Sequence, residues 1–503
     1  MTKRYDLVVI GGGAAGIVSS VMAGGLHLRV LMIEKDRIGG ECLYTGCVPS
    51  KALLHAAHTA HKIRHAAEIG LKPVDYSRHD TYAVMEWVKR SIKDVANANQ
   101  TEAMLRQFNV EIRRGDAHFT SPHTVQLGGE EIYGDHFVLA TGSHPYVPEI
   151  PGLQNVPYLT NTSIFDLTEV PESLLIVGGG PVGVEMAQAF SRLGSRITLV
   201  QRNRRIVPRE DARIALSLQQ ILQDENITIL CGAQVTSVAA TDQGITATVS
   251  TDTDICDVVA SHILCATGRR PNVEGLQLES AGVEVTSRGI TADSRLRTSR
   301  KNIYVAGDLL GDCQYSHMAE YEAKLAVRNI LFPGASKAKF RVVPRVLFTE
   351  PELASVGLTE EEATAQNKTY RVYQKPFTQD DRAITDNAAS GEVKVLAHPI
   401  TGHILGAHIL GPRAGELIME WLFAMEKGHP IMTIADMTHP YPTLTMASQR
   451  AAQKWYEELA KRPIVSSGLD CYVRRVRPHT CAFAATAAIV AVGGALFGLR
   501  RKM

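Results

Sequence analysis

The chain has 503 residues, more than one hydrophobic core usually organises, so we expect about three domains. With 45% apolar and 21% charged residues, it has enough apolar side chains for a large core. This excludes a disordered chain, a collagen-like repeat and a polytopic membrane protein. The 53 basic and 52 acidic residues give a net charge of +1, which provides no long-range field to attract nucleic acid. We therefore expect no nucleic-acid partner.

The cysteine content indicates the redox compartment. Eight cysteines in a chain of this length are too few for a disulfide scaffold, so we expect a reducing, cytoplasmic compartment in which any disulfide is catalytic. The chain opens into a strand-like run from Tyr5 to Ile10, and we expect no cleaved secretory signal before it.

A glycine-rich turn, VVIGGGAAG, follows this first run. Gly11 allows a tight turn, Gly13 lets the backbone approach a pyrophosphate, and Gly16 lets the following helix pack on the strand. Glu34 ends the next strand-like run, where a carboxylate accepts a hydrogen bond from an adenosine ribose. The pattern predicts a dinucleotide site, the alternative being an ordinary strand-to-helix turn with a surface glutamate.

The same pattern recurs in LLIVGGGPVGVE, which contains Gly178, Gly180 and Gly183. At the position equivalent to Glu34 stands Gln201, and the arginines Arg202, Arg204 and Arg205 follow it. A carboxylate there would repel a 2′-phosphate, whereas arginines accept one, so we predict NADP as the second cofactor. NAD remains the alternative if Arg202 points to water.

The segment GGECLYTGCVPSK carries two cysteines, Cys42 and Cys47, followed by Lys51. Cysteines at i and i+5 approach disulfide distance where the first turn of a helix is distorted. A zinc site would need closer pairs and two more ligands. Helix N-terminal amides and the Lys51 ammonium would lower the pKa of a thiol here, as a redox-active pair requires.

This segment resembles the active-site signature of the class I pyridine nucleotide-disulfide oxidoreductases, which include glutathione reductase, dihydrolipoamide dehydrogenase and mercuric reductase. The resemblance covers about nine-tenths of the chain, and its further motifs are ATGS from Ala140, ATGRRPN from Ala266, IYVAGD ending in Asp308, and FTEPELASVGLTE from Phe348. It implies FAD at the first glycine-rich turn and the nicotinamide cofactor at the second. It further implies that Asp308 contacts the ribityl chain, that Glu185 pairs with Lys51 beside the flavin, and that Thr141, Gly142 and Gly268 line the cofactor sites.

The resemblance also implies a relay from the nicotinamide through FAD to a disulfide between Cys42 and Cys47. In the family the second cysteine lies against the flavin and the first attacks the substrate, so we assign charge transfer to Cys47 and thiol exchange to Cys42. We therefore expect an FAD-dependent NAD(P)H:disulfide oxidoreductase that reduces a small-molecule or protein disulfide or another thiol-reactive acceptor.

The predicted fold is α/β, with two Rossmann-like dinucleotide-binding domains, a C-terminal α+β dimerisation domain and a hydrophobic tail helix. We expect FAD-binding parts at 1–150 and 271–340, an NAD(P)-binding domain at 151–270, and a homodimer formed through 341–462. Residues 463–503 would form a linker, Pro463–Gly468, and a tail.

One motif departs from the family pattern. The family's general base is a histidine in a His-Pro-Thr motif, reached from the partner subunit, with an acid five residues later, but this chain reads HPYPTLTMAS. Tyr441 and Met446 take those two positions; if His439 is taken instead, Leu444 stands at the acid position. Tyr441, at the position of the histidine, is the catalytic candidate. Because tyrosine is a poor base at neutral pH, we expect an acceptor other than lipoamide or glutathione.

Two alternative functions remain open. Mercuric reductases share a run like Pro442–Met446, yet no adjacent cysteine pair ends this chain, because Cys471 and Cys481 lie ten residues apart. The second alternative is a membrane-associated redox-sensing or electron-transfer flavoprotein.

The tail holds eighteen uncharged residues, Ala482–Leu499, which as a helix would span about 27 Å. We predict that this segment attaches the cytoplasmic body to the inner membrane, the alternative being a docked helix. Four histidines, His55, His58, His61 and His65, recur at helical spacing, and we interpret them as a solvated stripe rather than a metal site.

Overall fold

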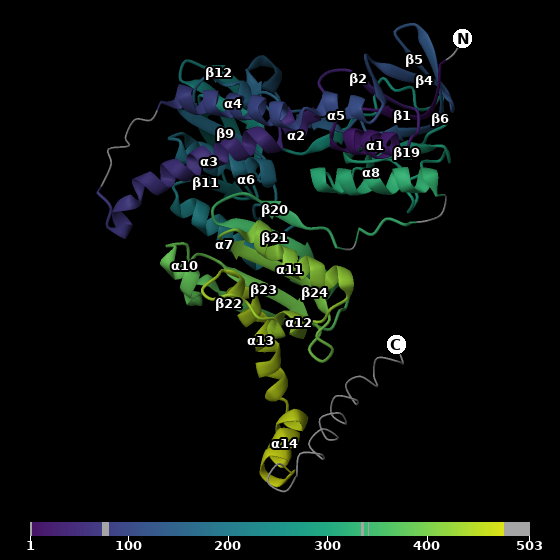
Figure 1. Ribbon diagram of the computed structural model, residues 1–503. Helices are drawn as coiled ribbons and strands as arrows, with labels where there is room; N and C mark the ends of the chain where they lie inside the picture. Colours follow the sequence, from purple (N-terminus) through teal and green to yellow (C-terminus); the bar gives the residue numbers. More distant parts are fainter. Residues whose placement is uncertain (1–2, 73–79, 333–335, 341, 477–503) are drawn as a thin grey trace. The chain divides into compact units, whose positions relative to one another are not determined.

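The computed structural model describes residues 3–72, 80–332, 336–340 and 342–476. Contacts between residues divide the chain into two units (Figure 1). The first comprises Met1–Pro208 and Gln219–Phe340, and the second comprises Arg209–Leu218 and Arg341–Met503. The domain boundaries expected from the sequence stay predictions.

The first unit contains a Rossmann-like layer built on the N-terminal strand. Strand β1 (Lys3–Ile10) pairs in parallel with β2 (Val30–Glu34), and helix α1 (Ala14–Gly25) connects them. The apolar end of β1 is buried on both faces, as a central parallel strand requires. Helix α8 (Ser316–Leu331) lies beside α1 (Figure 1). The sheet order is β3-β2-β1-β6-β5-β4, with β19 paired to β6; the other strands are β3 (Val110–Arg114), β4 (Ala117–Ser121), β5 (Thr124–Leu127), β6 (Glu130–Leu139) and β19 (Ile303–Val305).

A second Rossmann-like layer repeats the arrangement. Strand β9 (Ser173–Val177), helix α6 (Pro181–Arg192) and strand β10 (Arg196–Gln201) form a parallel βαβ unit. Pro181 occupies the first turn of α6, where its missing N–H costs no helical hydrogen bond. The sheet order is β11-β10-β9-β15-β8, with β8 (Tyr158–Leu159), β11 (Thr228–Cys231) and β15 (His262–Cys265).

The remaining elements of the first unit surround these layers. An antiparallel sheet is formed by β12 (Gln234–Thr241), β13 (Gly244–Ser250) and β14 (Ile255–Ala260), and two pairs are formed by β7 (Ser143–Pro145) with β16 (Arg269–Pro271) and by β17 (Val285–Thr286) with β18 (Gly289–Ile290). The other helices are α2 (Gly40–Tyr44), α3 (Cys47–Arg64), α4 (Thr81–Asn99) and α5 (Thr101–Gln107).

The second unit is an antiparallel sheet with helices on it, as expected for an α+β domain. Its strand order is β20-β21-β24-β23-β22, with β20 (Arg345–Leu347), β21 (Glu352–Gly357), β22 (Arg371–Pro376), β23 (Glu392–Ala397) and β24 (Ile404–Gly411). Trp421 of α11 (Ala414–Lys427) and Trp455 of α13 (Thr445–Ala460) are buried in its core. The other helices are α9 (Glu360–Ala365), α10 (Asp381–Thr385) and α12 (Ile431–Asp436).

An internal segment of the chain also belongs to this second unit. The fully buried ammonium of Lys394 on β23 donates to Asp211 at 2.8 Å, and Arg213 pairs with Glu392 at 2.7 Å. These charged pairs attach residues 209–218, where helix α7 (Ala212–Asp224) begins, to the sheet.

The turn-like conformation expected at Pro463–Gly468 is wrong. These residues form the start of helix α14 (Pro463–Cys471), and proline is well tolerated at the first helical position. Their role as a linker stays a prediction. The predicted tail helix, Ala482–Leu499, lies outside the described residues and stays a prediction. Among the residues that the structure describes, none of the helices has the length and apolar character needed to cross a membrane.

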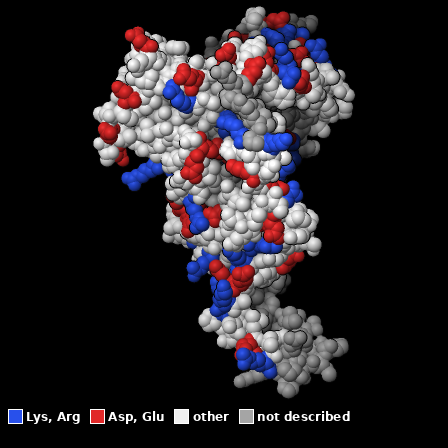
Figure 2. Space-filling view, turned by 90° about the vertical axis from the view of Figure 1, so that its left-hand side faces the viewer, with Lys and Arg blue, Asp and Glu red and all other residues white. Residues whose placement is uncertain are grey.

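The charged side chains of both signs are mixed on one face of the molecule (Figure 2). On the face shown in Figure 2, lysine and arginine side chains lie among aspartate and glutamate side chains. This mixture agrees with a net charge of +1.

Candidate active site

The first glycine-rich turn has a backbone that requires glycine at Gly11 and Gly16. Gly11 has φ +109°, and a Cβ there would overlap the carbonyl oxygen of Ala140. A Cβ at Gly16 would overlap the carbonyl oxygen of Gly11, so α1 packs directly on the strand. Gly13 is the N-cap of α1 and provides no side-chain cap, and a Cβ there would meet no atom within 4 Å. Uncapped first-turn amides beside open space fit the pyrophosphate of FAD.

Glu34 is held at the end of β2, next to this turn. Its carboxylate accepts hydrogen bonds from the backbone N–H groups of Gly12 at 2.5 Å and Asp36 at 2.7 Å. Both bonds orient the side chain that the sequence assigns to the adenosine ribose.

The second turn has the same backbone. Gly178 has φ +113°, a Cβ at Gly183 would overlap the carbonyl oxygen of Gly178, and Gly180 caps α6 without a side chain. Here the buried Gln201 accepts from the N–H of Gly179 at 3.2 Å, as Glu34 does at Gly12 in the first turn. An amide therefore replaces the carboxylate at the point where a ribose would bind.

The arginines after β10 lie close to this point in the chain. Arg202 and Arg204 are exposed, while Arg205 is half-buried and donates to the carbonyl oxygen of Pro208 at 3.3 Å. The two exposed guanidinium groups are available to a phosphate-bearing ligand.

The two cysteines stand at the junction of two helices. Cys42 lies in the short helix α2, and Cys47 is the first residue of α3, after the uncapped N-cap Gly46. Both are free thiols and form a hydrogen bond with each other. That bond and burial raise the pKa of Cys42, whereas the same bond, Ser316 and the Lys51 ammonium lower the pKa of Cys47 to about 6. The exposed Cys47 is therefore the sulfur that carries a thiolate at neutral pH.

Three further groups surround the pair. Lys51, one turn along α3, forms an ion pair with the buried Glu185 of α6 at 2.8 Å. Ser316, the first residue of α8, places its Oγ 3.4 Å from the sulfur of Cys47. The sequence analysis missed Ser316, since no local signal relates it to a cysteine 269 residues earlier.

The loops after β6 and β19 form another side of the expected FAD site. Asp308 follows β19 and accepts from the Ser143 hydroxyl at 2.5 Å. Thr141 donates to the carbonyl oxygen of Asn272 at 2.7 Å, and Gly142 has φ +74°. Gly268 has φ +138° and is exposed, so the backbone there is open to a ligand.

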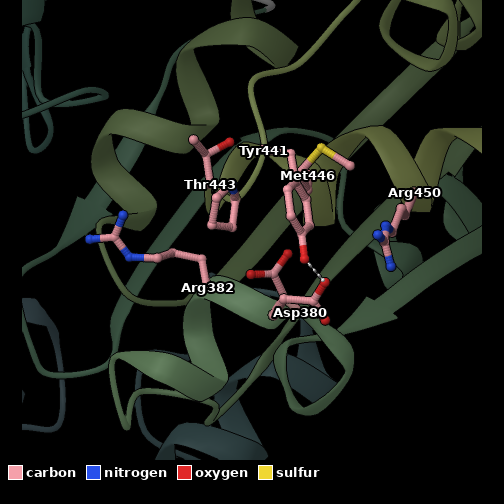
Figure 3. A pocket seen from close by; sticks show the side chains of 8 residues that line it. Asp380, Arg382, Tyr441, Thr443, Met446 and Arg450 are labelled. Atoms are coloured by element: carbon pink, nitrogen blue, oxygen red, sulfur yellow. Dashed lines mark hydrogen bonds between the residues drawn. The ribbon is translucent and has the colours of Figure 1, made fainter.

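Tyr441 lies in the second unit, at a shallow hollow that is open to solvent (Figure 3). Its hydroxyl donates to Oδ2 of Asp381 at 3.0 Å, and 68% of the residue's surface is exposed. The bond to Asp381 raises the pKa of Tyr441, so the phenol stays protonated at neutral pH. The hollow is lined by Asp380, Asp381, Arg382, Tyr441, Pro442, Thr443, Met446 and Arg450.

His439 has an acid partner that the spacing did not predict. Its Nε2 lies 3.0 Å from Oε2 of Glu420 on α11, and its Nδ1 lies 3.1 Å from the carbonyl oxygen of Met437. The side chain of His439 is only 4% exposed within the chain. This pair therefore fixes the loop before Tyr441.

Three of the four histidines on and just after α3 make side-chain contacts. His58 accepts from Arg192 at 2.8 Å, and the rings of His61 and His65 lie 4.1 Å apart. The described part of the chain holds no group of three or more metal-ligating side chains.

Comparisons with known proteins agree on one family. Residues 5–323 match the family described as pyridine nucleotide-disulphide oxidoreductase, and residues 343–452 match its dimerisation domain. A mercuric reductase of Bacillus cereus is 32% identical over 91% of this chain and 72% of its own length. A dihydrolipoyl dehydrogenase of Thermus scotoductus is 35% identical over 91% of this chain and 98% of its own length.

Solved structures give the same result. The HOCl-induced flavoprotein disulfide reductase RclA from Escherichia coli, in its Cu(II) complex, has a TM-score of 0.80 and 27% identity, covering 90% of this chain and all of its own. LpdA from Mycobacterium tuberculosis has a TM-score of 0.81 and 27% identity, covering 90% of this chain and 99% of its own.

Proposed function

Because the chain belongs to the pyridine nucleotide-disulphide oxidoreductase family, whose enzymes use FAD and NAD(P)H, we propose that it passes electrons from NADPH through FAD and the Cys42–Cys47 pair to a thiol-reactive acceptor. The observation that carries this proposal is the pair itself, with a low pKa at the exposed Cys47 and the Lys51–Glu185 ion pair beside it. The match to the dimerisation domain supports a homodimer.

The residues described above have different roles in the proposed reaction. Bound FAD would supply hydride acceptance from the nicotinamide and two-electron transfer to the disulfide. Gly11, Gly13, Gly16 and Glu34 would hold its adenosine diphosphate part. Lys51 stabilises the Cys47 thiolate, which leaves Cys42 as the thiol that reacts with the acceptor.

With a disulfide acceptor, the sulfur chemistry balances as follows. The Cys42 sulfur, after losing its proton, attacks one acceptor sulfur, forms a mixed disulfide and releases the first thiolate, which takes a proton. The Cys47 thiolate then attacks the Cys42 sulfur, releases the second thiolate, which takes a proton from solvent, and restores the Cys42–Cys47 disulfide. NADPH supplies the electron pair for the next cycle.

Tyr441 is not suited to the role of a base. Asp381 holds its phenol protonated at neutral pH, so Tyr441 would not take a proton from the Cys42 thiol. This favours acceptors that react without a strong base to activate Cys42.

The test is steady-state NADPH oxidation with a panel of disulfides, quinones and Hg(II). Cys42→Ser and Cys47→Ser should each lower the rate with the true acceptor at least about 100-fold, because each removes one atom of the disulfide. Cys256→Ser, at an exposed cysteine on β14, is the matched control and should retain full activity. If no acceptor exceeds the background with oxygen, the proposal fails and a redox-sensing flavoprotein becomes the better account.

Reduction of Hg(II) is the second candidate. It is favoured by similarity to mercuric reductases and by Tyr441 in place of the family's histidine. The expected signature is Hg(II)-dependent NADPH oxidation with release of elemental mercury. An enzyme that Hg(II) only inhibits would contradict this candidate.

The location of the enzyme is a separate proposal. We propose that residues 482–499 attach it to a membrane, and deletion of residues 469–503 should move it from the membrane fraction to the supernatant. Unchanged fractionation of the shortened chain would contradict attachment through this segment.

A further inference from the structure

The redox motif contains a carboxylate for which the function above has no use. Glu41 directly precedes Cys42 in α2, and its side chain is 35% exposed. Burial raises the pKa of the Glu41 carboxyl, and its contact with Arg269 opposes that rise. A negative charge beside a cysteine pair destabilises thiolates, so this position needs a compensating cation.

Arg269 on β16 provides that cation. Its Nη2 bonds to the Glu41 carboxylate and donates to the carbonyl oxygen of Ser143 at 3.0 Å. Its Nε donates to the Ser143 hydroxyl at 2.7 Å. Four contacts, the last being an approach to Asp308, fix the guanidinium.

The same guanidinium reaches the expected flavin site. Nε of Arg269 lies 3.6 Å from Oδ2 of Asp308, which also accepts from Ser143 at 2.5 Å. Glu41 and Asp308 are 267 residues apart in the sequence, and Arg269 lies between their two carboxylates. One cation therefore contacts both the carboxylate before Cys42 and the carboxylate assigned to the ribityl chain, and it offsets part of their negative charge.

We propose that Glu41 and Arg269 are positioning residues: their ion pair ties the start of the redox motif to the Ser143–Asp308 turn, and Arg269 lowers the negative charge at the expected FAD site. This inference rests on the proposed function, in which Cys42, Cys47 and Asp308 act around FAD. It assigns Glu41 a role in arranging the site and assigns Arg269 a role in holding both of its sides.

The neighbouring Arg270 provides a matched control. It belongs to the same short strand, is exposed, and its guanidinium lies over the ring of Tyr146 at 4.4 Å. Arg270→Gln removes the same charge from the same strand without touching Glu41 or Asp308.

The experiment is a double-mutant cycle on full-length protein, with Arg269→Gln, Glu41→Gln and the double variant, at a pH above the carboxylate range. The two readouts are the dissociation constant of FAD and the intensity of the thiolate-to-flavin charge-transfer band after anaerobic reduction. Neither readout depends on the acceptor.

Arg269→Gln should weaken FAD binding about tenfold or more and diminish the band, because two carboxylates then face the site without their cation. Glu41→Gln alone should change FAD binding less than about threefold, and the double variant should recover much of the loss. A role of Arg269 in packing alone would give no such recovery.

The inference is overturned if Arg269→Gln behaves like Arg270→Gln, or if Glu41→Gln has the same effect with and without Arg269. Should Arg269→Gln fail to fold, Arg269→Lys serves instead, since it retains the charge but loses the planar set of N–H donors of the guanidinium. Arg269→Lys must then weaken FAD binding less than expected for Arg269→Gln, and Glu41→Gln must again reduce that weakening. Failure of the proposed function is recognised separately, by full acceptor reduction in Cys42→Ser.

Discussion

The two glycine-rich turns of the first unit have nearly the same backbone but different side chains at the end of the following strand. Gly11 and Gly178 share a left-handed φ, and in each turn a later glycine, Gly16 or Gly183, packs against the carbonyl oxygen of the first. In the first turn the Glu34 carboxylate accepts a hydrogen bond from a backbone N–H, and in the second turn the Gln201 amide oxygen does so. We therefore expect the glycines of each turn to build a site for a dinucleotide, and the last residue of the following strand to select which dinucleotide binds.

The largest expected effect comes from placing a methyl group in each turn. Gly16→Ala should cost about 3 kcal/mol, or roughly 100-fold in FAD binding, because the new Cβ would overlap a backbone oxygen. Gly183→Ala should leave the protein yellow but abolish flavin reduction by NADPH. Absorbance of the purified variants and their thermal melting check this, and loss of flavin from Gly183→Ala would show that the turns are not independent.

Replacing Gln201, the last residue of β10, should alter the preference between NADPH and NADH. Gln201→Glu places a carboxylate near a 2′-phosphate and should shift the ratio of kcat/KM for NADPH and NADH toward NADH by about 10- to 100-fold. Glu34→Gln should leave that ratio unchanged and weaken FAD binding by about tenfold. An unaltered ratio in Gln201→Glu would mean that this position does not face the ribose.

Removal of one arginine should have a smaller effect. Arg202→Ala should raise KM for NADPH by about fivefold and leave KM for NADH unchanged, since an exposed charged hydrogen bond contributes about 1 kcal/mol. Arg209→Ala, at another exposed arginine further along the same loop, is the control. Equal losses with both cofactors would argue against recognition of the 2′-phosphate.

The first turn also differs from the second in the cysteine pair that follows it, and this difference predicts a pH dependence. The bond from Cys42, together with Ser316 and Lys51, lowers the pKa of Cys47 to about 6, so the thiolate persists above that pH and is lost as the pH falls through it. Lys51→Met should move this transition to higher pH. A pH titration of the charge-transfer band in the reduced enzyme measures the transition in the wild-type protein and in Lys51→Met. A transition at the same pH in both proteins would contradict the claim that Lys51 lowers the pKa of Cys47.

Local patterns predicted much of this molecule. The family match confirms the α/β fold, the FAD and NAD(P)H cofactors and the dimerisation domain. These features were predictable because glycines with a special backbone and a closely spaced cysteine pair form recognisable local sequence patterns. The helical conformation of Pro463–Gly468 was not predicted, since proline followed by small residues is typical of a turn although proline also starts helices.

Contacts between distant segments could not be predicted in this way. Arg269 meets Glu41, Ser316 meets Cys47, and Tyr441 meets Asp381 only after the chain has folded. The acid partner of His439 comes from α11, 19 residues earlier, rather than from the expected spacing. Such pairs depend on the tertiary arrangement of exposed or half-buried polar groups, for which no periodicity exists in the sequence.

The central claim is that two sulfur atoms beside a flavin store the electron pair. Anaerobic titration of the yellow protein with NADPH tests it directly. The account predicts uptake of a second reducing equivalent beyond flavin reduction, with a long-wavelength thiolate-to-flavin band that Cys47→Ser lacks. Uptake that ends with the flavin alone, or a band that persists in Cys47→Ser, would contradict it.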